Sequence, residues 1–313
     1  MKIVAILQTY NEQRFVGCCL DHLAAHGISV YLIDNESTDE TVAIAERRLT
    51  QNLIGIETLP RDGCFSLRAQ LARKEQLAQS LQADWFIHVD ADELRVPPHS
   101  RRSLADAIAE IDEAGFNAVN FLEFNFVPTR EHPDHDHPEF ARTMRSYYPF
   151  LPRFPHRLNA WKHRDGPVDL ASSGGHRIRF PGLRMAPESL YSRHYPFLSL
   201  EHLASKYVSR RFAADEIAQG WHRVRSQLDP AKVKLPSESE LRTYVADHLL
   251  DPSKPRKREL INPLSMRRAR DDSRKLLGGA LRRGGRGVRA LKSAVSQGRR
   301  SPTARRDLDR DTR

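Results

Sequence analysis

The chain has 313 residues, of which 39% are hydrophobic and 29% charged, with a formal net charge of +10 at pH 7. This length allows one large domain or two small ones, and the three cysteines (Cys18, Cys19 and Cys64) exclude a disulfide framework and, by their spacing, a zinc site. No apolar stretch approaches the roughly 18 residues of a membrane span, and the apolar opening is too short for a signal peptide, so we expect a soluble, cytoplasmic body.

The first half of the chain alternates strand and helix patterns, which predicts a mainly parallel central sheet flanked by helices. The predicted strands cover residues 3–7, 29–33, 54–58 and 84–90. The predicted helices run from about Glu12 to Gly27, from a capping box at Ser37 and Glu40 to about residue 49, and over residues 66–81.

The second half is less regular. A helix over residues 100–113 and a long strand over 117–127 precede a Pro- and His-rich stretch, 128–155, which we expect to form loops over a binding surface. Short elements are predicted at 158–163, 176–180 and 191–195, and helices at 200–219 and 238–250.

The strand over 84–90 ends in acids: Asp90, Asp92 and Glu93. Open α/β sheets place ligands at the carboxyl ends of their strands. On a regular strand, Asp90 and Asp92 would point to the same side, and paired carboxylates suit Mg²⁺ or Mn²⁺. By itself the motif is equally compatible with a solvated acidic turn.

Two common nucleotide sites are excluded by the turn after the first strand. That turn, residues 8–12, lacks the glycines of a dinucleotide-binding fingerprint, and the chain has no Walker A loop. A nucleotide would therefore be held by side chains and a bridging metal.

Four ordered motifs resemble those of family 2 glycosyltransferases with the GT-A fold. They are Thr9-Tyr10-Asn11-Glu12, Asp34-Asn35-Glu36-Ser37-Thr38-Asp39, Ala72-Arg73-Lys74 and Asp90-Ala91-Asp92-Glu93, followed more loosely by Gly174-Gly175-His176 and His194-Tyr195-Pro196. The resemblance implies an α/β, GT-A type body over residues 1–252. Its nucleotide-sugar half would span residues 1–130 and its loop-rich acceptor half residues 131–252.

The resemblance also implies residue roles. The nucleotide sugar would contact Thr9, Tyr10, Asn11, Glu12, Asp34, Arg73 and Asp90. The alternative for Asp34 is a helix-capping turn acid, but Ser37 already offers the helix cap, which favours the nucleotide role. Arg73 is equally compatible with an exposed helix arginine, and Lys74 replaces the family's usual asparagine.

For the metal, Mn²⁺ or Mg²⁺, the resemblance implies Asp92 as a ligand, with Asp90 beside it and His194 as a third member. Lys206 is a candidate phosphate contact, although an exposed helix lysine is the simpler interpretation. The implied reaction inverts the anomeric centre and needs a carboxylate base, for which Asp169 and Glu123 are candidates. His176, after two glycines, is the candidate acceptor-side contact.

The Pro- and His-rich stretch contains several residues that could bind a metal: His132, Asp134, His135, Asp136, His137 and Glu139. Because it lacks helical spacing, a mobile loop over the acceptor is favoured over a second metal site.

The tail carries the positive charge. Residues 253–313 hold 20 Lys and Arg against 6 Asp and Glu, a net of +14, whereas residues 1–252 hold 30 against 34, a net of −4. We expect a disordered tail, with a basic amphipathic segment contacting the anionic inner face of a membrane as the alternative.

The leading hypothesis is a metal-dependent glycosyltransferase acting on a cell-envelope, polysaccharide or lipid-linked acceptor. The alternatives are an inactive GT-A domain that binds a saccharide or partner, and a basic-tailed nucleic-acid-binding protein, for which charge is the only support.

Overall fold

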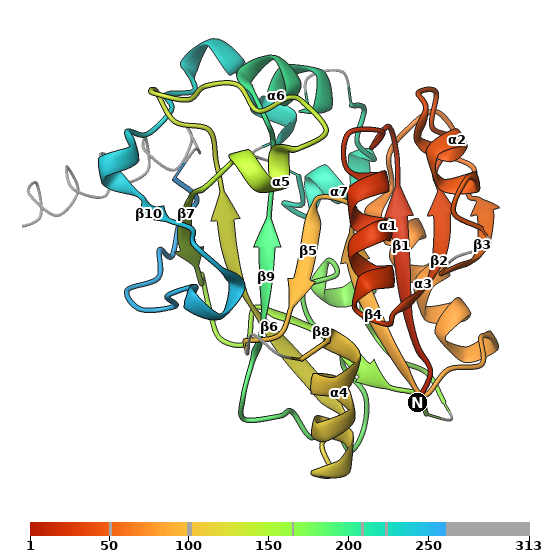
Figure 1. Ribbon diagram of the computed structural model, residues 1–313. Helices are drawn as coiled ribbons and strands as arrows, with labels where there is room; N and C mark the ends of the chain where they lie inside the picture. The colour runs from red at the N-terminus through yellow and green to blue at the C-terminus, as the bar shows by residue number, and fades with distance from the viewer. Residues whose placement is uncertain (50–51, 99–101, 165, 208–209, 223–224, 261–313) are drawn as a thin grey trace, which may run out of the picture. The chain divides into compact units, whose positions relative to one another are not determined.

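The computed structural model describes the chain except for residues 50–51, 99–101, 165, 208–209, 223–224 and 261–313. All described residues belong to one compact unit, residues 1–263. Among them, ten strands form a single sheet in which eight follow the order β10-β7-β6-β8-β4-β1-β2-β3 (Figure 1). No helix of the described residues is long and apolar enough to cross a bilayer.

The first half forms the parallel part of the sheet. Strands β1 (Ile3–Thr9), β2 (Ser29–Asp34), β3 (Leu53–Thr58) and β4 (Trp85–Asp90) pair in parallel, as predicted. Helix α1 (Val16–Ala25) packs on one face and α3 (Leu67–Ser80) on the other, while α2 (Thr41–Glu46) contacts α1 (Figure 1). Because both faces of β1 and β4 are covered, their side chains form nearly continuous apolar runs.

The second half makes the sheet mixed instead of mainly parallel. Strand β6 (Ala118–Phe126) pairs antiparallel with β7 (Ser146–Phe150) and β8 (Arg157–Lys162), and parallel with β9 (Leu190–His194). Strand β8 joins the two halves through its antiparallel pairing with β4. Two short strands, β5 (Glu93–Val96) and β10 (Arg242–Thr243), pair antiparallel with β9 and β7.

The remaining helices are short. They are α4 (Leu104–Glu113), α5 (Phe140–Thr143), α6 (Leu200–Tyr207) and α7 (Ala214–Ala218), with 3₁₀ turns η1 (Ala171–Ser173), η2 (Arg225–Gln227), η3 (Pro230–Lys232), η4 (Glu238–Glu240) and η5 (Asp247–Leu249). Helix α4 begins at a capping box of Ser103 and Asp106, and Ser66 caps α3.

Several sequence predictions were wrong where long-range contacts decide the local structure. The predicted helix over 200–219 is divided, because Phe212 forms an isolated bridge with Phe65. The predicted helix over 238–250 is absent: β10 pairs with β7, and Tyr244 N donates to the Arg145 carbonyl. Residues 128–155 contain α5 and β7 in addition to loops, and β5 was not predicted.

The capping box predicted at Ser37 was also wrong. Helix α2 begins at Thr41, whose amide donates to Asp39 Oδ1 at 3.0 Å. The Ser37 hydroxyl instead accepts from the Asn11 amide at 2.9 Å, so it joins two loops and caps no helix.

The described chain continues past residue 252 along β7. The Arg256 amide donates to the Pro149 carbonyl, and the Leu151 amide donates to the Arg256 carbonyl. Leu260 packs near Tyr148 and Phe150. The predictions for the rest of the tail concern residues 261–313, which lie outside the described residues.

Candidate active site

Hydrogen bonds to the Asp34 carboxylate join the ends of β1 and β2. Thr9 Oγ1 donates to Asp34 Oδ1 at 3.1 Å, and the Ser37 amide donates to Asp34 Oδ2 at 2.8 Å. Thr9 and Asp34 are both buried. Both oxygens of Asp34 therefore organise the loop, and a nucleotide base would have to share them.

Asn11 fastens the same two loops from the other side. Its Oδ1 accepts from the Thr38 amide at 2.8 Å, and its Nδ2 donates to Thr38 Oγ1 at 3.3 Å. Its φ of 55° lies in the left-handed region, which asparagine tolerates better than most residues. We call this set, Thr9, Asn11, Asp34, Ser37 and Thr38, the loop junction.

Tyr10 lies between two arginines. The Arg61 guanidinium lies 3.5 Å from the centre of its ring, and that of Arg210 lies 5.3 Å away. Arg210 Nη2 also donates to the Tyr10 carbonyl at 3.2 Å. Two guanidinium groups therefore lie beside the loop that follows β1.

The acids after β4 do not follow strand alternation. Strand β4 ends at Asp90 and β5 begins at Glu93, so Asp92 lies in a turn and the expectation that it shares a strand face with Asp90 was wrong. The Asp92 carbonyl accepts from the Tyr195 amide at 2.8 Å, which brings the turn to the end of β9. Asp90 Oδ1 is buried without a hydrogen-bond partner.

Asp92 is held by two cationic side chains. Lys206 Nζ donates to Asp92 Oδ2 at 2.7 Å, and His194 Nε2 lies 3.7 Å from the same oxygen. Burial alone would raise the pKa of Asp92, but the charges of Lys206 and His194 outweigh it and lower this pKa well below its usual range. Lys206, expected as an exposed helix lysine, is buried.

Glu123 and Asn125 on β6 orient the His194 ring. Its Nδ1 lies 2.8 Å from Glu123 Oε1 and 2.8 Å from Asn125 Oδ1, so Nε2 faces Asp92. The parallel register pairs His194 with Asn125, two residues from Glu123 on the same face of β6. Burial favours neutral His194, yet Asp92 and Glu123 together raise its pKa to about 10.

These groups continue a longer series of buried charges. Glu93 Oε2 lies 2.5 Å from Arg95 Nη2, and Arg157 lies between Glu93 (3.5 Å) and Glu123 (2.6 Å). At the other end, Lys206 also approaches Glu12 at 3.4 Å, and Arg210 lies 3.7 Å from Glu12. We call the series the buried ion chain: Arg95, Glu93, Arg157, Glu123, His194, Asp92, Lys206, Glu12 and Arg210.

The side chains around Asp92 can be compared with the ligands that a divalent metal needs. Within the described residues, no group of three or more His, Cys, Asp or Glu side chains could hold a metal. Asp92 and His194 instead offer an oxygen and an imidazole nitrogen that converge, with the unpartnered Asp90 Oδ1 as a further carboxylate oxygen. Such a set fits Mg²⁺ or Mn²⁺ only if ligand phosphates complete the coordination shell.

Sequence comparison identifies the family. The family model described as glycosyl transferase family 2 matches residues 4–163, about half of the chain. The chain belongs to glycosyl transferase family 2. An uncharacterized glycosyltransferase of Rickettsia conorii is 26% identical over 229 residues, which cover 70% of this chain and 72% of that relative. One of Rickettsia felis is 26% identical over 229 residues, covering 70% and 71%.

Solved structures are more distant. Residues 1–349 of S. aureus TarS match 70% of this chain and 69% of that chain at 16% identity, with a TM-score of 0.40. A Pyrobaculum calidifontis mannosyltransferase in complex with GDP-Man and Mn²⁺ matches 69% and 66% at 16% identity, with a TM-score of 0.38. Such loose superpositions assign no ligand to this chain. The family match confirms the predicted family, and with it an enzyme that uses a nucleotide-sugar donor. The α/β architecture confirms the predicted fold class.

Arg73, a predicted nucleotide-sugar contact of this family 2 glycosyltransferase, and its neighbour Lys74 both bind other protein groups. Arg73 forms a two-pronged ion pair with Glu57 of β3, both bonds at 2.7 Å. Lys74 is buried, with Nζ 2.7 Å from His88 Nδ1 and donating to the Val89 carbonyl at 3.2 Å. Burial lowers the pKa of Lys74 to about 7.

Of the two glycines before His176, Gly175 is required by packing. A Cβ on Gly175 would lie 2.9 Å from His88 Nε2, and its φ is +82°. His176 itself stacks on His156, with ring centres 5.0 Å apart, and its Nδ1 lies 3.3 Å from Arg157 Nη1. His176 therefore borders the ion chain from the second half of the protein.

The two candidate bases differ in their surroundings. Glu123 has 1% of its side chain exposed and lies against Arg157, His156 and His194. Burial would raise its pKa, but Arg157 and the two histidines hold it well below the usual value. Asp169 is partly exposed and accepts from the amide and hydroxyl of Ser172. Within the described residues, no hydrogen bond or ion pair joins Asp169 to the ion chain.

The His-rich loop is fastened to its neighbours. Asp136 pairs with Arg14 at 2.7 Å, and the His135 amide donates to the Leu198 carbonyl at 2.9 Å. Among the residues described, this loop holds no candidate metal group.

Glu216 was not predicted as an important residue. Its hydrogen bonds hold residues 210–222 against the start of α3. Its carboxylate accepts from Ser66 Oγ and from the Leu67 and Arg68 amides, at 3.0, 3.1 and 2.7 Å. An acid one turn into a short helix gives no signal of such a distant role.

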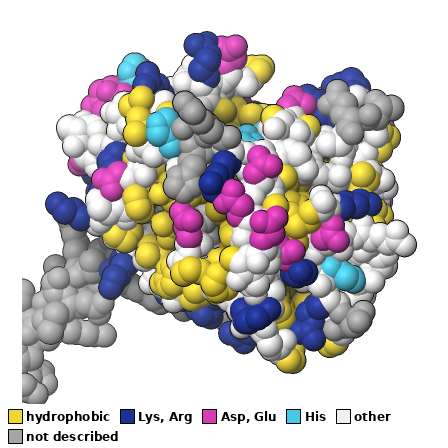
Figure 2. Space-filling model, turned by 60° about the horizontal axis from the view of Figure 1, so that its bottom comes forward, with side chains coloured by type: hydrophobic (Ala, Val, Ile, Leu, Met, Phe, Trp, Pro, Cys, Tyr) yellow, Lys and Arg dark blue, Asp and Glu magenta, His cyan; other side chains and the backbone are white. Residues whose placement is uncertain are grey.

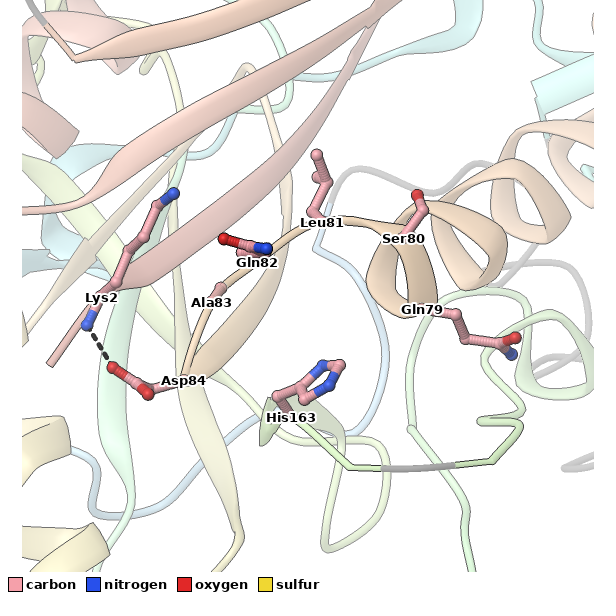
Figure 3. Close-up of a pocket in the computed structure, with 8 residues that line it drawn as sticks. All are labelled: Lys2, Gln79, Ser80, Leu81, Gln82, Ala83, Asp84 and His163. Atoms are coloured by element: carbon pink, nitrogen blue, oxygen red, sulfur yellow. Dashed lines mark hydrogen bonds between the residues drawn. The ribbon is translucent and has the colours of Figure 1, made fainter.

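An open pocket lies at the opposite, amino end of β1 and β4 (Figure 3). Its ionisable lining residues are Lys2, Asp84 and His163, and the Lys2 amide donates to Asp84 Oδ2 at 2.5 Å. Since the ion chain lies beyond the carboxyl end of β4, this pocket is separate from the candidate active site.

Proposed function

We propose that this glycosyltransferase moves a sugar from a nucleoside-diphosphate donor to an acceptor hydroxyl, with inversion and with a divalent metal. The supporting observation is the convergence of Asp92, His194 and Lys206 beyond the end of β4, inside a water-poor ion chain. Charged groups fixed in such surroundings stabilise a leaving diphosphate more strongly than the same groups in water.

The proposed donor site has two parts. The loop junction, with Tyr10 and Glu12, would hold the nucleoside, and Asp34 would accept from its base. Asp90 would contact the ribose or the metal, and Asp92 and His194 would be metal ligands. When bound, Mn²⁺ or Mg²⁺ would neutralise charge on the departing diphosphate.

For the base, the contacts favour Asp169 over Glu123. A general base needs a lone pair that can accept the acceptor's proton. Glu123 is buried and its charge is stabilised by Arg157, so it is a weak base. Asp169 is partly exposed, and its hydrogen bonds are to Ser172 of its own turn. We propose a cell-envelope, polysaccharide or lipid-linked acceptor, with His176 on the acceptor side.

Calorimetry with UDP-, GDP- and dTDP-sugars, each with and without Mn²⁺, tests the proposal. At least one sugar nucleotide should bind, and binding should weaken without Mn²⁺ and in Asp92→Ala. Asp84→Ala, just before the amino end of β4, is the matched control and should bind normally. If no donor shows metal-dependent binding, the proposal is wrong.

The nucleic-acid alternative receives no support from the body. Residues 1–252 carry a net charge of −4, from 30 basic and 34 acidic residues. On the face shown in Figure 2, Lys and Arg side chains are scattered among acidic and hydrophobic ones and form no continuous basic patch. Salt-dependent DNA binding by a chain without residues 261–313 would revive this alternative.

A further inference from the structure

Lys206 pairs with Asp92, the carboxylate that the proposed function makes a metal ligand. Its amine donates to Asp92 Oδ2 at 2.7 Å and lies 3.4 Å from Glu12 Oε2, with 4% of the side chain exposed. It also lies 4.8 Å from the centre of the Phe15 ring. The amine thus lies between two carboxylates and against one aromatic face.

A buried carboxylate requires a cation beside it, because an unpaired charge away from water is costly. Lys206 meets this need for Asp92. However, a divalent metal bound to the same carboxylate would stand close to the ammonium, and like charges a few ångströms apart repel strongly in such surroundings. Lys206 and the metal therefore compete for Asp92.

The surroundings give the amine alternative partners. Lysine carries its charge on a flexible four-carbon stem, so the amine can move while the backbone of α6 stays in place. Glu12 Oε2 is buried without a hydrogen-bond partner, and the Lys206 amine already lies 3.4 Å from it. A donor diphosphate placed by the metal would bring further anionic oxygens to the same space.

We propose that Lys206 is an exchangeable counterion. It neutralises Asp92 while the site holds no donor, and it turns to the diphosphate when the metal takes its place on Asp92. This proposal rests on the proposed function, and it explains how an acidic turn stays buried in both states.

The proposal predicts opposite effects of one substitution. In Lys206→Met, Asp92 loses its competitor, so Mn²⁺ alone should bind the full-length protein more tightly, by about tenfold if one charged hydrogen bond is relieved. The same variant should bind the preferred nucleoside diphosphate with Mn²⁺ about tenfold more weakly, because the diphosphate loses its lysine. Free Mn²⁺ is measured by electron paramagnetic resonance and nucleotide by calorimetry.

Two further variants separate charge from shape. Lys206→Arg keeps a cation and should retain weak binding of Mn²⁺ alone, as in the wild type, together with most of the nucleotide affinity. Glu12→Gln removes the alternative partner, so the amine should stay on Asp92 and Mn²⁺ alone should bind more weakly. Thermal unfolding checks that each variant is folded, and Glu12→Gln tests the exchange if Lys206→Met does not fold.

The outcomes are distinct. If Lys206→Met weakens binding of both Mn²⁺ and nucleotide, Lys206 only supports the site and the exchange is refuted. If nucleotide affinity is unchanged, the proposed second partner is refuted. A wild type that binds no donor in the calorimetric panel contradicts the proposed function, whereas the effect of Lys206→Met on Mn²⁺ alone still tests the competition for Asp92.

Discussion

The loop junction and the buried ion chain meet at the same end of the sheet, yet different forces hold them together. The junction links residues 9–11 with residues 34–38 through hydrogen bonds that do not pair opposite charges. The ion chain joins charged side chains from β5, β6, β8, β9 and α6. A hydrogen bond contributes about 1 kcal/mol between neutral partners and about 1.5–3 kcal/mol when it reaches a charged group such as the Asp34 carboxylate. Removing one partner of a buried ion pair costs about 3–5 kcal/mol.

Because of this difference, substitutions in the two regions should change the stability of the protein in different ways. In the junction, every bond is small and its loss should stay local. In the ion chain, each charge depends on the next, so removing one leaves its neighbours uncompensated.

Arg157→Met should have the largest effect. It leaves Glu93 and Glu123 buried without the guanidinium between them, which should lower the free energy of unfolding by about 3–5 kcal/mol. Urea denaturation measures this loss. The double variant Arg157→Met/Glu123→Gln removes a charge of each sign and should recover part of it. A loss below about 1 kcal/mol in the single variant would contradict the view that the charges are interdependent.

The far end of the ion chain should make stability depend on pH. His22 Nε2 donates to the Arg95 carbonyl at 2.7 Å, and burial first, then the neighbouring charge of His26, lowers the pKa of His22 to about 4. Arg193 and Asp247 also act on the ring. Between the unfolded pKa of 6.5 and the folded value of about 4, the unfolded state binds more protons.

The contribution of His22 to the free energy of unfolding is therefore complete above pH 6.5 and is lost as the pH falls to about 4. This loss is at most about 3 kcal/mol. Urea denaturation across this range should show a shallower loss in His22→Gln, which can still donate to the Arg95 carbonyl. Equal slopes for variant and wild type would show that other buried histidines cause the dependence.

The junction was largely predictable from sequence, and the ion chain was not. Thr9 and Asp34 end the adjacent, parallel strands β1 and β2, and Asn11 follows β1, so strand order alone brings them together. The resemblance to a known family added the turn with Asp90 and Asp92 and a histidine at the end of a later strand.

Glu93, Arg95 and Arg157 were missed because their contacts depend on register. Arg157 lies opposite Phe121, two residues before Glu123, and Glu93 lies opposite His194. Neither pairing can be deduced from strand patterns, because a shift by one residue reverses every side chain. One signal was available: charged residues interrupt apolar strand runs at Arg95, Glu123 and Arg193.

Asn11→Ala should have a moderate effect on the junction. It removes both side-chain bonds to Thr38 and places an alanine Cβ at a φ of 55°, a combined loss of about 2 kcal/mol. Asn11→Gly removes the same bonds without the backbone strain and should recover about 1 kcal/mol. If alanine and glycine are equal in urea denaturation, the left-handed backbone contributes nothing.

Arg73→Gln should have the smallest effect on stability. It also tests whether Arg73 contacts the nucleotide sugar, as the family resemblance implies. The guanidinium, with 34% of the side chain exposed, is held by Glu57, and exposed ion pairs contribute about 0.2–1 kcal/mol. Nucleotide affinity should change less than about twofold, because the arginine is turned toward β3. The control Glu57→Gln releases Arg73. If that release tightens nucleotide binding, or if Arg73→Gln weakens it tenfold, Arg73 leaves Glu57 when the donor binds, and the resemblance describes the bound state better than the contacts of this structure do.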